Sequence, residues 1–238
     1  MSTQEFKNSI LKTLSSSTIN RLHLEPVKFD LLHEIEFPGQ PIRNLFFVEE
    51  GMASITNTFE DGSQVEVGMF GYESIIGVSA LMGTKQSLNR VYTQIPGSGF
   101  CCTFEDAKRE FDRGEQFQQL ALRYVQAQLV QAMQSAGCNG KHEVGPRLAR
   151  WLLLCADRVH RNQFDMSHEF LSEMLGLTRS SVTRACRVLK NEGLIDYSRG
   201  VMHLLDIKAL EKKSCECYGI IKNHLDSITE FDTGVPHR

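Results

Sequence analysis

The chain has 238 residues, of which 41% are hydrophobic and 23% are charged, and its formal net charge is −3. This length favours two modest domains over one large domain, and the composition excludes collagen-like and wholly disordered proteins. The longest strongly apolar run covers the six residues 151–156, whereas a membrane-spanning helix needs about 20. The first residues also lack the apolar region of a secretory signal. We therefore expect a cytoplasmic protein without a membrane partner.

Residues 27–103 have the pattern of an antiparallel β-structure. Their apolar or alternating stretches are short, and turn signals rich in Gly, Pro and Asp interrupt them about every 8–12 residues. Two pairs of strands are expected: residues 45–48 with 53–56 around Gly51, and residues 58–59 with 64–67 around Asp61-Gly62. We predict that residues 1–113 form one β-domain, either a barrel or a sandwich.

A long helix is predicted over residues 114–139, where turn signals nearly vanish and Gln, Ala and Leu dominate. Apolar residues three and four positions apart form one seam on this helix: Leu122, Val125, Leu129, Ala132 and Ala136. The spacing suits a helix that packs on a copy of itself. The alternative is packing on the helix's own barrel, for which the adjoining face offers Phe117, Leu120 and Tyr124; both can hold at once. Residues 137–140, which include two glycines, are predicted to end the helix and form a hinge.

Residues 140–213 predict a winged helix. A first helix carries a buried apolar stripe between Leu148 and Val159. Ser167 is a plausible cap for a short helix that Gly176 ends, and Thr178 is a plausible cap for a second helix to about Asn191. Two helices joined by such a turn predict a helix-turn-helix, and the following strands around residues 198–200 predict a β-hairpin wing. Residues 214–238 are expected to form a helical tail.

The positive charge of the chain lies in this winged-helix segment. Residues 1–140 hold 11 Lys and Arg against 16 Asp and Glu, residues 141–213 hold 13 against 9, and residues 214–238 hold 2 against 4. A polyanionic partner is therefore expected to meet residues 141–213 only. The alternative is a charged face that only contacts solvent.

The second helix of the predicted helix-turn-helix has the residue types of a DNA-reading helix. Arginine side chains bind guanine edges in the major groove, and hydroxyls serve phosphates or bases. The candidate DNA contacts are Thr178, Arg179, Ser180, Ser181, Arg184, Arg187 and, at the wing tip, Arg199. The opposite face, with Val182, Ala185, Cys186 and Leu189, is expected to be buried. These residues predict binding to double-stranded DNA.

Two segments, VGPRLARWLLL at residues 144–154 and SHEFLSEMLGLTRSSVTRACRVLKNEGLI at residues 167–195, resemble the DNA-binding half of the Crp/Fnr regulators. The resemblance extends in order over almost the whole chain. It implies an α+β fold with an N-terminal cyclic-nucleotide-binding-type β-roll, a long central dimerisation helix and a C-terminal winged helix-turn-helix. It also implies a homodimeric transcription regulator that binds a palindromic operator and meets RNA polymerase.

In that family the arginines at the positions of Arg179 and Arg184 contact DNA, often with a glutamate between them that reads cytosine. Here Ser180 stands where that glutamate commonly falls. The half-site is therefore expected to differ from the family consensus at the corresponding base pair.

The resemblance also raises the question of an effector, because the family's β-roll commonly binds a cyclic nucleotide through a Gly-Glu-Leu turn and a downstream Arg-Ser pair. The candidate effector residues of this chain are Gly71, Glu73, Ser74 and Arg90. Leu88 and Asn89 stand where the Arg-Ser pair should lie, so the phosphate-binding pair is missing. A cyclic nucleotide is a possible ligand, but cyclic AMP in the usual pose is not expected. The alternatives are an unrelated ligand or an effector-independent regulator.

The seven cysteines are expected to be thiols. Cys-x-x-Cys does not occur, and the pairs Cys101-Cys102 and Cys215-x-Cys217 have no second ligand pair nearby in the sequence, so no metal site is expected. These four cysteines leave open a redox- or thiol-responsive regulator. The iron-sulfur members of the family use N-terminal cysteines, which are absent here.

A β-barrel metalloenzyme is the least expected reading, because such a barrel needs clustered His ligands. No histidine lies between His33 and His142, and neither a nucleophile elbow nor a phosphate-loop motif occurs. We therefore expect no enzyme.

Overall fold

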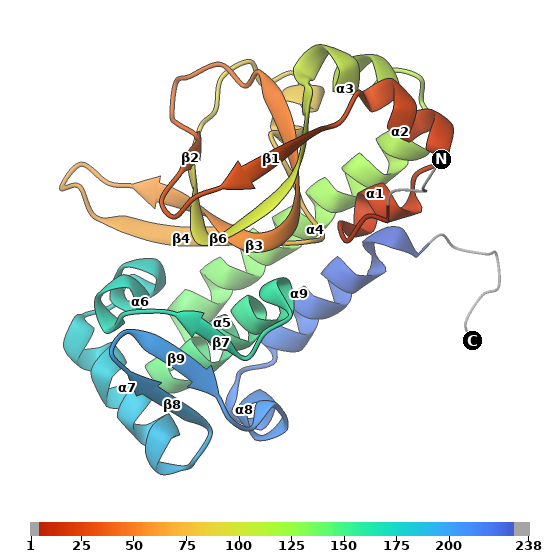
Figure 1. The fold of residues 1–238 in the computed structure, drawn as a ribbon. Coiled ribbons are helices and arrows are strands. Elements are labelled where there is room, and N and C mark those ends of the chain that lie inside the picture. Colours follow the sequence, from red (N-terminus) through yellow and green to blue (C-terminus); the bar gives the residue numbers. More distant parts are fainter. Residues whose placement is uncertain (1–4, 231–238) are drawn as a thin grey trace.

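The computed structural model describes residues 5–230 of the chain, so the ends of the predicted N-terminal domain and C-terminal tail lie outside the described residues. The fold is α+β, as predicted, with a β-roll above and a winged helix below in Figure 1 and a long helix running behind both. The β-roll is one antiparallel sheet in the order β1-β6-β3-β4, with β2 paired to β6 and β5 paired to β3. Its strands are β1 (Glu25–Phe29), β2 (Glu34–Glu36), β3 (Asn44–Thr58), β4 (Gln64–Phe70), β5 (Ile75–Ile76) and β6 (Arg90–Thr103).

The predicted turn at Gly51 is wrong, because β3 runs continuously through this position. Gly51 has a φ of +85°, and the pairing of β3 with β6 shifts register on both sides of it. A Cβ atom on Gly97 of β6 would lie only 1.8 Å from the carbonyl oxygen of Glu50. The glycines therefore allow two strands to cross closely and bend the sheet at a bulge. The second predicted hairpin, around Asp61-Gly62, is confirmed by the pairing of β3 with β4.

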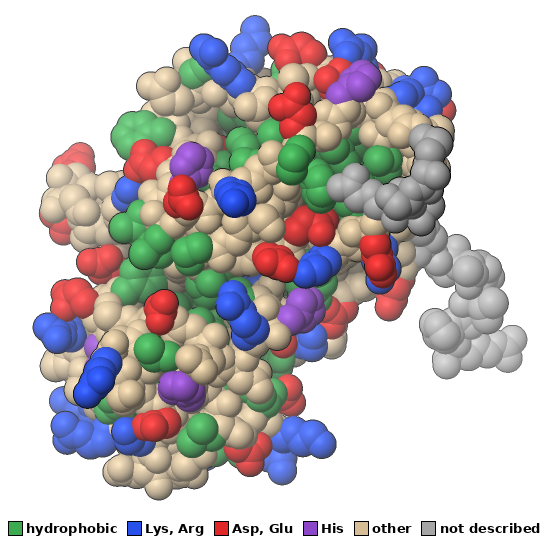
Figure 2. Space-filling model, viewed as in Figure 1, with side chains coloured by type: hydrophobic (Ala, Val, Ile, Leu, Met, Phe, Trp, Pro, Cys, Tyr) green, Lys and Arg blue, Asp and Glu red, His purple; other side chains and the backbone are tan. Residues whose placement is uncertain are grey.

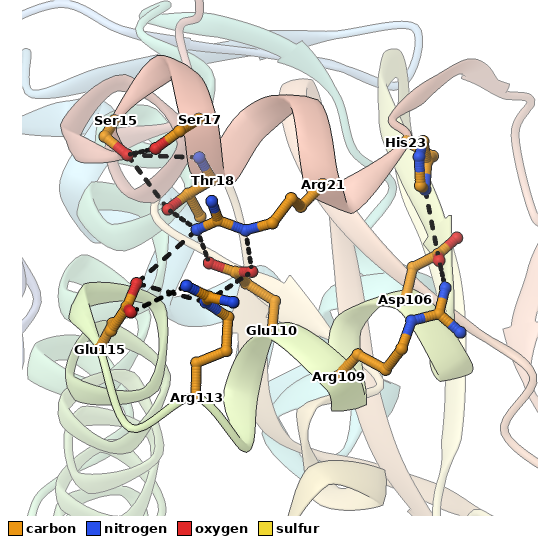
Figure 3. Close-up of polar contacts among 10 residues, drawn as sticks. All are labelled: Ser15, Ser17, Thr18, Arg21, His23, Asp106, Arg109, Glu110, Arg113 and Glu115. Atoms are coloured by element: carbon orange, nitrogen blue, oxygen red, sulfur yellow. Dashed lines mark hydrogen bonds and ion pairs between the residues drawn. The ribbon is translucent and has the colours of Figure 1, made fainter.

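Short helices close the β-roll at its N-terminal side: α1 (Ser9–Thr13), α2 (Ser16–Leu22), the 3₁₀ helix η1 (Val78–Met82) and α3 (Phe104–Phe111). Figure 3 shows the ion pairs that join α2 to α3. Nε of Arg21 lies 2.6 Å from Oε2 of Glu110, whose side chain is 2% exposed. The Arg21 hydrogen bond lowers the pKa of Glu110. This charge-assisted contact fixes the N-terminal helices on the β-roll.

The long helix α4 (Gln116–Lys141) continues past the predicted stop at residues 137–140, and His142 is its C-terminal cap. Two helical glycines cost about 1 kcal/mol each relative to alanine. Tertiary packing offsets this cost, because Cys138 is buried and the tail helix α9 packs along α4. The predicted break was wrong because local propensity is overridden by these contacts.

The winged helix has the predicted organisation. Its elements are α5 (Val144–Val159), β7 (Gln163–Asp165), α6 (His168–Leu175), α7 (Arg179–Asn191), β8 (Ile195–Ser198), β9 (Val201–Leu204) and α8 (Ile207–Lys213). The Ser167 and Thr178 side chains cap α6 and α7, and Gly176 ends α6 with a φ of +61°. The sequence did not indicate β7, which pairs with β9 and extends the wing to three strands.

The winged helix and the β-roll share one hydrophobic core. Across their interface, Nε1 of Trp151 on α5 donates a 2.8 Å hydrogen bond to Glu66 on β4. Nε of Arg158, also on α5, lies 3.3 Å from Oε1 of the buried Glu73. The tail follows α8 as α9 (Cys217–Asp226) and the 3₁₀ helix η2 (Ser227–Thr229). Across residues 5–230, no helix has the length and hydropathy that a membrane span requires.

Candidate nucleic-acid interface

Helix α7 has one buried face and one exposed face. The predicted inner residues Val182, Ala185, Cys186 and Leu189 are all buried. Arg184 and Arg187 point into solvent on the other side, together with Arg179 and Ser180 at the first turn. In Figure 2, Lys and Arg side chains gather around α7 at the lower left of the molecule. The helix is therefore anchored by its apolar face and presents cations outward.

The N-terminus of α7 is a ready site for a phosphate group. Oγ1 of Thr178 accepts a hydrogen bond from the amide of Ser181 at 3.3 Å, and it also contacts the hydroxyls of Ser180 and Ser181. This cap leaves further first-turn amides without helical partners, and helix starts of this kind bind anions. The hydroxyls of Thr178, Ser180 and Ser181 thus lie together at the start of α7, and their contact with DNA stays a prediction.

The exposed arginines are available to a partner. Nη1 of Arg179 lies 3.3 Å from Oε2 of Glu169, but both side chains are more than half exposed, and such surface pairs contribute little. For Arg184, Arg187 and Arg199, no ion pair is present among residues 5–230. A polyanion can therefore bind these three side chains without breaking an internal ion pair.

The wing is held against the helix-turn-helix by residues that the sequence analysis did not single out. His168 on α6 contacts the hydroxyl of Thr183 through Nδ1 at 3.1 Å and packs edge-on against the Tyr197 ring, with ring centroids 4.6 Å apart. The Lys190 ammonium lies over the same ring at 4.8 Å. Burial lowers the pKa of His168, which favours the neutral ring. No sequence signal reveals this contact, because it joins residues from α6, α7 and β8.

At the wing tip, Arg199 and Gly200 both have positive φ, at 50° and 83°. Such values at both central positions are those of a tight hairpin turn. The side chain of Arg199 is exposed at the end of this turn. The structure thus places Arg199 at the projecting end of the same domain, as predicted.

The four candidate effector residues do not form one pocket. Ser74 accepts a 2.8 Å hydrogen bond from the Gly71 amide, and Glu73 is paired with Arg158. Arg90 instead pairs with Glu34 and stacks on Tyr92. Strand β3 separates the two groups, since its residues 46–47 pair with β5 and its residue 56 pairs with Arg90. The structure therefore does not bring the four residues together, and an effector site at them stays a prediction.

A hollow of about 140 Å³ on the β-roll is lined by both Glu36 and Arg43. It contains Glu36, whose carboxylate accepts a hydrogen bond from Ser87. Burial raises the pKa of Glu36. A larger hollow, of about 590 Å³, lies between the start of α5 and the side of α7.

The predicted seam lies on the outer face of α4. Leu122 and Leu129 are 48% and 58% exposed, Ala132 and Ala136 are exposed, and Val125 is half-buried. Met133, which the sequence analysis did not include in the seam, is 66% exposed. The opposite face packs on the β-roll through the buried Phe117, Leu120 and Tyr124. The predicted packing on the chain's own barrel is confirmed, and an apolar strip is left on the other side.

The cysteines fall into two groups. Cys102 is buried, and burial raises its pKa to about 12, which disfavours a reactive thiolate. Burial also raises the pKa of the half-buried Cys101. Cys215 and Cys217 have no second ligand pair nearby in the sequence, but the fold supplies one, because Cys138 and His142 lie beside them. The sequence signal for Cys138 and His142 is their spacing of four residues, which places both side chains on one face of a helix.

Comparison with known proteins finds a family match for the helix-turn-helix segment and relatives along most of the chain. Residues 146–213 match the model of the Crp-like helix-turn-helix domain. The global nitrogen regulator of Nostoc sp. is 24% identical over 182 residues, which are 72% of this chain and 81% of that protein. The transcriptional regulator LdrP of Thermus thermophilus is 25% identical over 203 residues, which are 79% of this chain and 95% of that protein.

Solved structures share the architecture. FixK2 from Bradyrhizobium japonicum has a TM-score of 0.70 at 17% sequence identity, over 82% of this chain and 98% of FixK2. A transcriptional regulator of the Crp/Fnr family from Eubacterium rectale has a TM-score of 0.67 at 18% identity, over 85% of this chain and 96% of its own. These similarities establish a Crp/Fnr-like fold.

Proposed function

Because this chain is a transcription regulator of the Crp/Fnr type with a Crp-like helix-turn-helix domain, we propose that it binds a roughly palindromic DNA operator as a homodimer. The observation that carries the proposal is the exposed face of α7. Its arginines project from a helix that is capped by Thr178 and packed on its apolar side. This is the arrangement of a recognition helix whose first turns enter the major groove.

The proposed contacts divide into two kinds. Arg179 and Arg184 lie on the outward side of the first turns of α7 and are proposed to read base edges, since arginine binds guanine O6 and N7 through two hydrogen bonds. Thr178, Arg187 and Arg199 are proposed to bind phosphates, which position the protein without reading sequence. Ser180 and Ser181 are proposed to contact phosphate or base edges.

The dimer is proposed to form through the outer face of α4. Exposed Leu122, Leu129 and Met133 recur at helical spacing along this face, and burial of such apolar side chains drives helix pairing. Two copies related by a twofold axis would present two α7 helices. Their half-sites should lie about 34 Å apart, which is one turn of DNA.

The proposed function also carries proposals on the location of the protein, its further partner and its regulation. The protein would act in the cytoplasm, where its DNA lies, and would meet RNA polymerase there as a regulator of transcription. No catalytic activity is proposed for it. An effector that loosened the contact of α5 with Glu66 and Glu73 would release the winged helix from the β-roll and so change the relative position of the two α7 helices.

DNA-binding selection with the full chain, from a random library followed by footprinting, tests this proposal. The expected product is a site with two inverted half-sites about one helical turn apart. Arg161→Ala is the matched control for substitutions of the α7 arginines and should select the same site, because Arg161 is exposed in the same domain but lies outside α7 and the wing. Recovery of no preferred sequence at low ionic strength would contradict the proposal.

The dimer is tested by the mass of the protein in solution. Leu129→Asp is expected to give a monomer, because it would bury two carboxylates against each other across the seam. Leu129→Met keeps the apolar surface and should leave the dimer intact. An unchanged mass for Leu129→Asp would exclude this face as the dimer contact.

A further inference from the structure

Four metal-ligating side chains meet where α4, the winged helix and the tail come together. Cys138 and His142 lie one turn apart at the end of α4, and Cys215 and Cys217 lie at the start of α9. The Sγ atoms of Cys138 and Cys215 are 3.5 Å apart, and Sγ of Cys217 is 3.5 Å from Nδ1 of His142. All four ligand atoms lie within 4.8 Å of one another. The fold has therefore joined two ligand pairs that are more than 70 residues apart.

The cluster is shielded from solvent on its sulfur side. Cys138 and Cys217 are each 1% exposed, Cys215 is 7% exposed, and these three form a small buried group separate from the main core. His142 closes the cluster towards solvent with a side chain that is 20% exposed. A buried set of one imidazole and three thiols is a known ligand set for structural zinc.

The surroundings of the cluster match an outer coordination shell. Nε2 of His142 lies 3.3 Å from Oε1 of Glu216, so the ring turns its other nitrogen, Nδ1, towards the sulfurs. A ligating histidine almost always donates its second N–H to a carboxylate or carbonyl in this way. Nε2 of Gln134 donates to Sγ of Cys217 at 3.1 Å. The structure thus contains groups that orient the histidine and stabilise a thiolate.

We propose that Cys138, His142, Cys215 and Cys217 bind one zinc-class divalent ion in a closed tetrahedral site. Zinc lies about 2.3 Å from sulfur and about 2.0–2.1 Å from nitrogen, so its ligand atoms are about 3.5–3.8 Å apart. The 3.5 Å between Sγ of Cys217 and Nδ1 of His142 matches the sulfur–nitrogen edge, and the 3.5 Å between Sγ of Cys138 and Sγ of Cys215 is slightly shorter than the sulfur–sulfur edge. All four ligand atoms lie within 4.8 Å of one another, so small side-chain shifts would bring them to one ion. A disulfide would need sulfurs about 2.05 Å apart. An iron-sulfur cluster would need its ligands farther apart, because several metal ions lie between them.

The position of the site gives it a mechanical role. His142 lies two residues before α5 begins, and Cys215 lies two residues after α8 ends. A bound ion would therefore tie the end of α4 to both ends of the winged helix and to the tail. Binding displaces the thiol protons, so folding and metal binding are coupled at this joint. The consequence for DNA rests on the proposed function: the ion would fix the orientation of α7 relative to the dimer axis.

The metal content of the purified full chain tests the site. We expect about one zinc per chain by elemental mass spectrometry, and replacement by Co²⁺ should give the visible absorption of a tetrahedral thiolate site. The double variant Cys215→Ser/Cys217→Ser should lose the ion, whereas Cys101→Ser, outside the cluster, should keep it. Glu216→Ala should bind zinc about 10–100-fold more weakly.

Several results would overturn the site. These are no bound ion after refolding with zinc, an ion that the double variant retains, a Cys138–Cys215 disulfide, or iron with inorganic sulfide. Because the double variant could fail to fold, the Co²⁺ spectrum of the unsubstituted chain is the second measurement. A spectrum of octahedral cobalt would also overturn the proposal.

A separate arm tests the coupling to DNA. Zinc should be removed from the unsubstituted protein with a chelator, and the affinity for the selected operator should then fall at least tenfold and recover when zinc is added back. Stoichiometric zinc with no change in affinity would overturn the coupling but not the site. Operator binding by a protein that takes up no metal would overturn the site and leave the proposed function standing.

Discussion

The arginines of the winged helix fall into two populations that sequence composition cannot separate. Arg147, Arg150 and Arg158 are 7%, 5% and 3% exposed and lie on α5. The arginines of α7 and the wing are exposed. The first group is bonded inside the protein, as when Nη2 of Arg147 donates to the Leu175 carbonyl at 2.6 Å, whereas the second is open to solvent.

This difference shows that a local excess of cations overstates the charge available to DNA. Three of the 13 Lys and Arg residues of segment 141–213 are used to hold domains and helices together. The charge that can meet phosphates lies at the far side of the same domain. Substitutions in the two groups should therefore have opposite signatures, one on folding and the other on DNA binding.

The largest expected effect is that of Arg158→Ala on stability. It would leave the Glu73 carboxylate buried beside α5 without its ion-pair partner, and breaking a buried pair from one side costs about 3–5 kcal/mol. The measurement is urea unfolding of the full chain, with Arg187→Ala as the exposed control, which should change stability by less than about 0.5 kcal/mol. A loss below about 1 kcal/mol for Arg158→Ala would remove the distinction between the two populations.

The buried carboxylate that faces Arg150 and Arg158 should make stability depend on pH. Burial raises the pKa of Glu66 from 4.5 to about 7, so the folded state holds a proton that the unfolded state releases. The contribution of Glu66 to the free energy of unfolding is therefore fully present below about pH 4.5 and is lost as the pH rises through about 7. The loss amounts to about 3 kcal/mol at most, at 1.36 kcal/mol per pKa unit.

The variant Glu66→Gln tests this dependence, because its amide oxygen can still accept the Trp151 hydrogen bond. Thermal unfolding between pH 5 and 8 should be flatter for the variant than for the unsubstituted chain. Equal slopes would show that Glu66 is ionised in the folded protein throughout this range, with its charge balanced by Arg150 and Arg158.

Arg179→Ala and Arg184→Ala should each cost about 1–3 kcal/mol on the selected operator and relax its specificity. The thermal midpoint should not change, since both side chains are exposed. Affinity should be measured on the operator and on random DNA at one salt concentration. Equal losses on both DNAs would show that these arginines touch only phosphates.

The smallest expected effect is that of Arg199→Ala. As a phosphate contact at the wing tip, Arg199 should contribute to all sequences alike, and its removal should lower the slope of log affinity against log salt by about 1. A change confined to the operator would instead assign it a base contact.

The sequence predicted the helix-turn-helix and its outward residues well, because the deciding signals are local. Ser167, Gly176 and Thr178 act within a few residues of the helix ends that they specify. It failed where distant contacts decide. The turn predicted at Gly51 is instead a bulge, because the course of β3 depends on its pairing with the distant strand β6. The break predicted at residues 137–140 is instead helix, because the tail helix α9 packs on this part of α4.

By itself, the sequence determined the order of the three parts, the caps of α6 and α7 and the apolar seam of α4. Each of these follows from spacing along one helix or strand. Only the tertiary structure decided which arginines are buried and which carboxylates they meet. It also decided that Cys138 and His142 lie beside Cys215 and Cys217, because pairing across more than 70 residues depends on how whole helices pack and leaves no periodic trace in the chain.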